Sequence, residues 1–92
     1  FDKDPMMKNF LLAALGHVSI SKKDFKAAQD YFRQIEASDV NLLKDEAVYT
    51  LGMIYEASDK LVESRKQYEK IISDHKDSIY FAMAQSKVAE IR

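Results

Sequence analysis

An internal repeat at an offset of 36 residues constrains the fold of this chain more than any other feature. Leu15-Gly16 recurs as Leu51-Gly52, and these two glycines are the only ones among the 92 residues. Apolar or small residues recur at the same offset, pairing Leu12 with Val48, Phe25 with Leu61, Ala28 with Ser64, Phe32 with Tyr68, and Ile35 with Ile71. A fixed period of this size indicates that one supersecondary unit occurs twice.

The spacing of apolar residues predicts that this unit is a pair of helices. With two glycines and one proline, the chain has too little turn chemistry for many strands. Phe25, Ala28, Phe32 and Ile35 follow at steps of 3, 4 and 3 residues, which is one face of a helix. We expect one all-α domain with helices over residues 5–20, 24–37, 43–57, 60–73 and 78–92. Because the links are short, consecutive helices should be antiparallel.

Single residues add detail to these helices. Asp4-Pro5 should start the first helix, with Asp4 as N-cap and Pro5 as its first residue. Ser58-Asp59 and either Asp77 or Ser78 are the expected caps of the fourth and fifth helices. The apolar stripe of the first helix is expected at Leu11, Leu15 and Val18, widened by Met7, Phe10 and Ala14.

The two glycines lie inside helices, where glycine costs about 1 kcal/mol relative to alanine. A close approach of the second helix of each pair would offset that cost. The small residues Ala28 and Ser64 are the expected opposing positions of Gly16 and Gly52.

These positions resemble the tetratricopeptide repeat (TPR) family, whose unit has Leu-Gly in its first helix and a small residue, an aromatic and a further core residue in its second. The first unit matches with Leu12, Leu15-Gly16, Ala28, Phe32 and Ile35, and the second with Val48, Leu51-Gly52, Tyr55, Ser64, Tyr68 and Ile71. The chain departs from the family at Ser19 and Ser64, and it lacks the closing proline, with Val40 and Lys76 in its place. The resemblance implies helix pairs stacked as a short right-handed TPR solenoid, two repeats plus a C-terminal capping helix.

The C-terminal segment from Asp77 to Ile91 is similar to the ending of many bacterial TPR proteins, including cell-envelope proteins with a soluble repeat domain. This resemblance implies the periplasmic side of a bacterial envelope, with the cytoplasm as the alternative. Because the sequence begins with Phe1 rather than Met, we expect it to be part of a longer chain.

Composition argues against several other classes of function. There is no cysteine, and His17 has no metal ligand at helical spacing. His75 lies beside Asp74 and Asp77 in a polar link, and we interpret it as a solvated residue. We therefore expect no metal, no cofactor and no enzyme activity. The net charge of -1 does not suggest a nucleic-acid partner. The longest apolar run, Phe10 to Leu15, is too short to insert into a membrane.

The TPR resemblance implies a protein or peptide partner held in a concave groove lined by the first helices. The matching inner positions are Phe10, Ala13, His17 and Ile20 in the first unit, and Glu46, Tyr49, Met53 and Glu56 in the second. Aromatic rings and methionine suit an apolar anchor, and the two glutamates suit positive charge on the partner. The alternative is that Phe10 and Tyr49 pack against a neighbouring helix and Met53 fills a gap in the core.

A second hypothesis is structural: the chain is the terminal section of a longer solenoid that mediates assembly and has no ligand of its own. More than one face of the first helix is covered by apolar residues, which are Met6, Met7, Phe10, Leu11, Ala14, Leu15 and Val18. We therefore expect part of that helix to contact an upstream repeat or a second copy of the chain, as a homo-oligomer.

Overall fold

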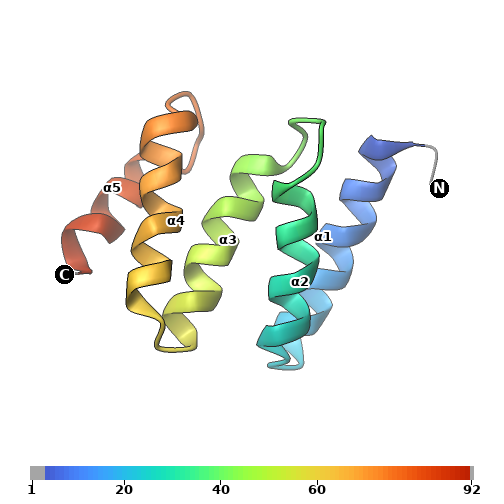
Figure 1. Cartoon of the computed structure of the whole chain (residues 1–92), viewed down its shortest axis with the longest axis horizontal. Coiled ribbons are helices and arrows are strands. Elements are labelled where there is room, and N and C mark those ends of the chain that lie inside the picture. The colour runs from blue at the N-terminus through green and yellow to red at the C-terminus, as the bar shows by residue number, and fades with distance from the viewer. Residues whose placement is uncertain (1–3, 92) are drawn as a thin grey trace.

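The computed structural model describes residues 4–91, and it confirms the all-α prediction. Its five helices are α1 (Pro5–Ser21), α2 (Phe25–Glu36), α3 (Lys44–Ala57), α4 (Leu61–Asp74) and α5 (Phe81–Glu90). They follow one another along the long axis, with α1 at one end and α5 at the other (Figure 1), in a body of 41 × 30 × 17 Å. No helix in the described part of the chain has the length and hydropathy needed to cross a bilayer.

The first four helices begin and end within one residue of the expected bounds, but the fifth does not. It begins at Phe81 rather than at residue 78, and it ends at Glu90. The Ser78 hydroxyl accepts a hydrogen bond from the Tyr80 amide at 3.0 Å and donates one to Asp45 at 2.7 Å. Ser78 therefore shapes the turn before α5 instead of capping the helix. Residue 92, the expected end of this helix, lies outside the described residues.

The turns within the two helix pairs have the same construction. Lys23 and Asp59, which are 36 residues apart, are both left-handed, with φ of 61°. In the first turn the Asp24 amide donates to the Ser19 carbonyl, and in the second the Lys60 amide donates to the Tyr55 carbonyl, both at 2.8 Å. Ser58-Asp59 therefore belongs to this turn and does not cap α4, whose N-cap Lys60 makes no side-chain bond. At α1, the predicted cap is confirmed, because Asp4 accepts from the amides of Met6 and Met7.

Two clusters of buried side chains form the core. The first joins α1, α2 and α3 around Phe32, Ile35 and Leu51. The second joins α3, α4 and α5 around Tyr68, Ile71 and Ala84. Each odd-numbered helix after α1 therefore packs on the helix pair that precedes it.

The prediction for the apolar stripe of α1 was wrong. Leu11, Leu15 and Val18 are 42%, 48% and 51% exposed, and the residues of α1 that are buried are instead Asn9, Leu12, Ala13 and Gly16. Apolar residues cover α1 on nearly every side, so their spacing alone could not select the face that meets α2.

The close approach expected at the glycines is present, but an aromatic ring rather than a small residue makes it. A Cβ atom at Gly16 would lie 2.5 Å from the Phe32 ring, and one at Gly52 would lie 2.6 Å from the Tyr68 ring. Ser64 contributes differently, because its hydroxyl donates to the Gly52 carbonyl at 2.8 Å. Each glycine thus makes room for the largest fully buried side chain of its own pair.

Candidate functional site

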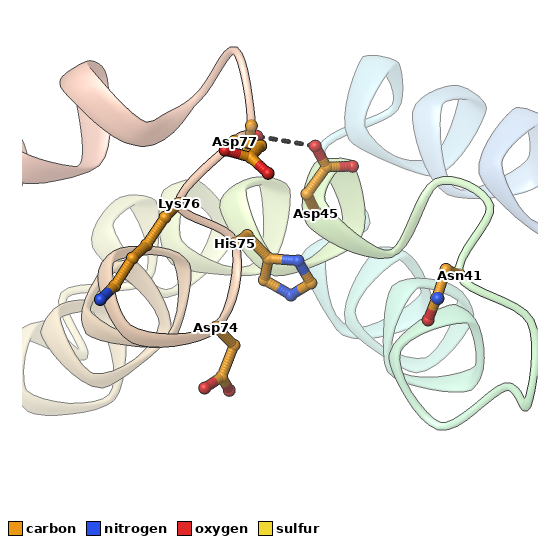
Figure 2. A pocket seen from close by; sticks show the side chains of 7 residues that line it. Asn41, Asp45, Asp74, His75, Lys76 and Asp77 are labelled. Atoms are coloured by element: carbon orange, nitrogen blue, oxygen red, sulfur yellow. Dashed lines mark hydrogen bonds between the residues drawn. The ribbon is translucent and has the colours of Figure 1, made fainter.

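A hollow of about 420 Å³ lies beside the turn that precedes α5. Asn41, Asp45, Asp74, His75, Lys76, Asp77 and Ser78 line it. Figure 2 shows the hydrogen bond between Ser78 and Asp45 at this hollow, and the Lys76 side chain pointing away from the His75 ring. Within residues 4–91, no three His, Cys, Asp or Glu side chains are grouped so that they could hold a metal ion.

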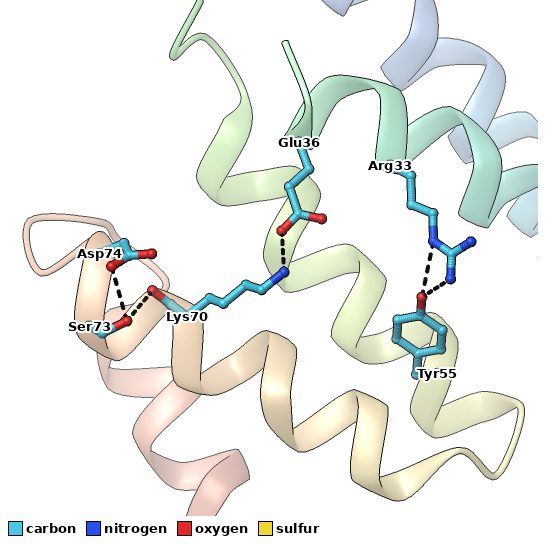
Figure 3. Close-up of polar contacts among 6 residues, drawn as sticks. All are labelled: Arg33, Glu36, Tyr55, Lys70, Ser73 and Asp74. Atoms are coloured by element: carbon cyan, nitrogen blue, oxygen red, sulfur yellow. Dashed lines mark hydrogen bonds and ion pairs between the residues drawn. The ribbon is translucent and has the colours of Figure 1, made fainter. Parts of the chain in front are cut away.

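One side of the molecule is held together by polar contacts that involve the second helices of the two pairs. Lys70 of α4 bonds Glu36 of α2 at 2.8 Å, and Arg33 of α2 donates to the Tyr55 hydroxyl of α3 (Figure 3). These contacts bridge the two pairs, and their charged groups are already partnered.

The odd-numbered helices α1, α3 and α5 meet along a different surface, which we call the first-helix face. His17 of α1 lies 3.0 Å from Glu46 of α3. Farther along, Lys87 of α5 bonds Glu56 of α3 at 3.3 Å. The first-helix face therefore runs across both pairs and onto α5, and it includes most of the residues that the TPR resemblance singled out.

The side chains on this face that are free to contact a partner are mainly apolar. Phe10 and Met53 are 52% and 42% exposed, so Met53 does not fill a gap in the core. Met83 of α5 is 45% exposed, and its sulfur lies 3.9 Å from the Tyr49 hydroxyl. His17 is also exposed, with its ring edge-on to Phe32 at 5.2 Å between centroids.

Two of the eight predicted groove residues are buried, and a third, Ile20, is partly buried against the first core cluster. Ala13 is only 8% exposed and belongs to the first core cluster. Tyr49 is equally buried, and its ring stacks on Tyr80 with centroids 4.9 Å apart and lies 5.3 Å from Tyr68. Tyr49 therefore packs against neighbouring elements, as the alternative prediction for this residue expected.

The two predicted acceptors, Glu46 and Glu56, are engaged within the chain. Glu46 pairs with His17, and Glu56 accepts from both Lys87 and the Tyr68 hydroxyl, the latter at 3.0 Å. Burial raises the pKa of the Tyr68 hydroxyl, and its bond to Glu56 raises it further. Tyr68 therefore stays neutral and remains a donor at physiological pH. The reason for expecting a positively charged partner is weakened accordingly.

Met83 is a surface residue that sequence reasoning missed. The 36-residue offset covers the first four helices and does not extend to the fifth, which the TPR resemblance implies is a cap. Extending the repeat with an offset of 37 residues places Met83 at the position of Glu46. That offset was the available signal, and the extra residue between the second and third units concealed it.

No protein family, no curated protein and no solved structure matches this chain.

Proposed function

We propose that this chain is a protein-interaction module of the TPR type, with α1–α2 and α3–α4 as its two repeats and α5 as its capping helix. Three repeated features support this arrangement: the 36-residue offset, the shared left-handed turn at Lys23 and Asp59, and the glycine–ring contacts in both pairs. Stacked helix pairs offer extended surfaces that suit the binding of a peptide or a helix.

The observation that carries the proposed function is the composition of the first-helix face. Its exposed apolar groups are Phe10, Met53 and Met83, while its charged groups, Glu46 and Glu56, are paired within the chain. Methionine is adaptable and aromatic rings supply contact area, so this face suits the apolar side of a partner helix or peptide. The partner would dock through apolar anchors rather than through positive charge.

The test replaces the exposed methionines and keeps the buried tyrosine. Partners captured from a bacterial extract are identified first, and their affinity is then measured by titration with Met53→Ala/Met83→Ala. We expect at least about a tenfold loss of affinity. The truncation of two anchor side chains should cost about 1.4 kcal/mol or more of binding free energy, which corresponds to a factor of ten in the dissociation constant. The melting temperature should change little, because both side chains are exposed.

Val62→Ala is the matched control, because Val62 is 65% exposed on α4 and belongs to neither core cluster. Affinity should be unchanged in that variant. Unaltered binding in the double methionine variant would mean that the first-helix face is not the binding surface.

A second candidate function is structural, with the chain acting as the terminal section of a longer assembly. The exposed apolar residues of α1 that lie away from α2 favour it. A module of this kind would need no ligand on the first-helix face.

A further inference from the structure

An uninterrupted apolar strip runs along the side of α1 that faces away from the core. It consists of Met7, Leu11, Leu15 and Val18, whose side chains are 41–51% exposed. We call these four residues the α1 strip. Their spacing of 4, 4 and 3 residues places them on one side of the helix. Contiguous exposed apolar surfaces are rare on monomeric proteins, and large ones mark interaction sites.

The same strip occurs twice more in the chain, and there it is covered. At an offset of 36 residues it is Leu43, Ala47, Leu51 and Ile54 of α3 and its N-cap. At a further offset of 37 residues it is Tyr80, Ala84, Val88 and Ile91 around α5. All three strips have the spacing 4, 4 and 3.

Each of the two later strips packs into the helix pair that precedes it. The α3 strip belongs to the core cluster formed with Ala28, Phe32 and Ile35 of α2. The α5 strip packs on Tyr68 and Ile71 of α4 in the same way. The α1 strip is the one of the three that has no helix pair against it among residues 4–91.

The two ends of the described chain differ in a way that restricts the occupant. At the α5 end, the positions equivalent to Val48 and Gly52 at the 37-residue offset are Gln85 and Ala89, and both are exposed. At that end, the position of Val48 is thus polar, and the position of Gly52 carries a Cβ atom, which the two helix pairs have no room for. Both helix pairs of the described residues already hold a strip, so a second copy has no free pair with which to cover α1.

We propose that the α1 strip is the docking surface for a further antiparallel helix pair of the same repeat type, seated on α1 as α1–α2 is seated on α3. The second helix of that pair would contact the α1 strip as α2 contacts the α3 strip through Ala28, Phe32 and Ile35. It would thus contribute a small residue, an aromatic ring and a branched aliphatic side chain. The strip is separate from Met53 and Met83, so this proposal does not depend on the proposed groove.

The absence of cysteine permits a direct test by thiol labelling. Leu15→Cys places one thiol in the strip. A second copy of residues 4–39 is then fused directly before Asp4, which keeps the 36-residue register across the junction. If the added pair docks, the labelling rate of the thiol should fall at least about tenfold relative to the chain without the fusion, as expected for a contact worth about 1.4 kcal/mol or more.

Two controls make the result specific. A thiol at Val62→Cys, on α4, should label at the same rate with and without the fusion. The fusion that carries Phe32→Asp in the added copy only should leave the Leu15→Cys thiol fast, because that copy cannot form its receiving core.

Three results would overturn the proposal. In the first, the added residues are helical by circular dichroism but labelling stays fast. In the second, the added residues remain unfolded although they are fused next to the α1 strip. In the third, the chain without the fusion is a dimer in solution whose Leu15→Cys thiol is already protected, which would assign the strip to a second copy.

Discussion

At the scale of single residues, the two glycines explain how each helix pair closes. Phe32 and Tyr68 have no exposed surface, and their rings fill the space that a Cβ atom at Gly16 or Gly52 would need. The rings are enclosed by the core, so they cannot move aside as a surface side chain could. The helix-destabilising effect of glycine is thus offset by the burial of a large aromatic side chain.

We therefore predict that Gly52→Ala destabilises the protein although alanine is the better helix former. Overpacking costs about 1–3 kcal/mol, and the gain in helix propensity returns about 1 kcal/mol. The net loss should be about 1 kcal/mol by urea unfolding, and Gly52→Leu should lose more. Met53→Ala, at the next position but exposed, is the control.

A double-mutant cycle with Tyr68→Leu locates the obstacle. If the ring is responsible, the cost of Gly52→Ala should shrink when the smaller side chain is present. An equal cost in both backgrounds would mean that something other than Tyr68 makes alanine unfavourable.

At the scale of helices and links, Asn9 connects two elements that no pattern in the sequence associates. Its side chain is 1% exposed, and its amide donates to the Leu42 carbonyl at 2.9 Å. Leu42 lies in the link between α2 and α3, directly before the left-handed Leu43. Asn9 thus holds this link against α1 and sets where α3 begins.

We predict that Asn9→Ala lowers the free energy of unfolding by about 1–3 kcal/mol, because the Leu42 carbonyl loses its donor in a partly buried site. Asn41→Ala is the matched control, since Asn41 is an exposed asparagine in the same link. Hydrogen exchange should show faster opening around residues 41–44 in the Asn9 variant. Equal stability of the two variants would contradict the role assigned to Asn9.

At the scale of the whole molecule, each helix pair depends on the odd-numbered helix that follows it. Without α5, the second core cluster around Tyr49, Tyr68 and Ile71 would be open to water. Arg65 of α4 also donates to the Ile91 carbonyl, which ties the end of α5 to the same pair. The helix that ends the described chain is therefore part of the core.

We predict that Ala84→Asp destabilises the whole domain by on the order of 3–5 kcal/mol, the usual effect of an uncompensated buried charge. Ala84 has no exposed surface, whereas Ala82, in the same helix, is exposed. Ala82→Asp should be neutral or slightly stabilising, because an acidic side chain near a helix N-terminus is favourable. Thermal unfolding followed by tyrosine fluorescence distinguishes the two. Similar melting temperatures would mean that α5 is dispensable.

Local sequence determined the parts of this protein that depend on local physics. The 36-residue offset, the scarcity of glycine and proline, and the cap at Asp4 predicted five helices and most of their ends, because helix formation depends on neighbouring residues. The tertiary structure alone decided which face of α1 is buried, that Tyr49 lies between Tyr68 and Tyr80, and that Glu46 and Glu56 are paired. Those outcomes depend on residues that are far apart in the sequence. Periodicity shows that a helix has an apolar face. When apolar residues surround the helix, only its packing against neighbouring helices decides which face is buried.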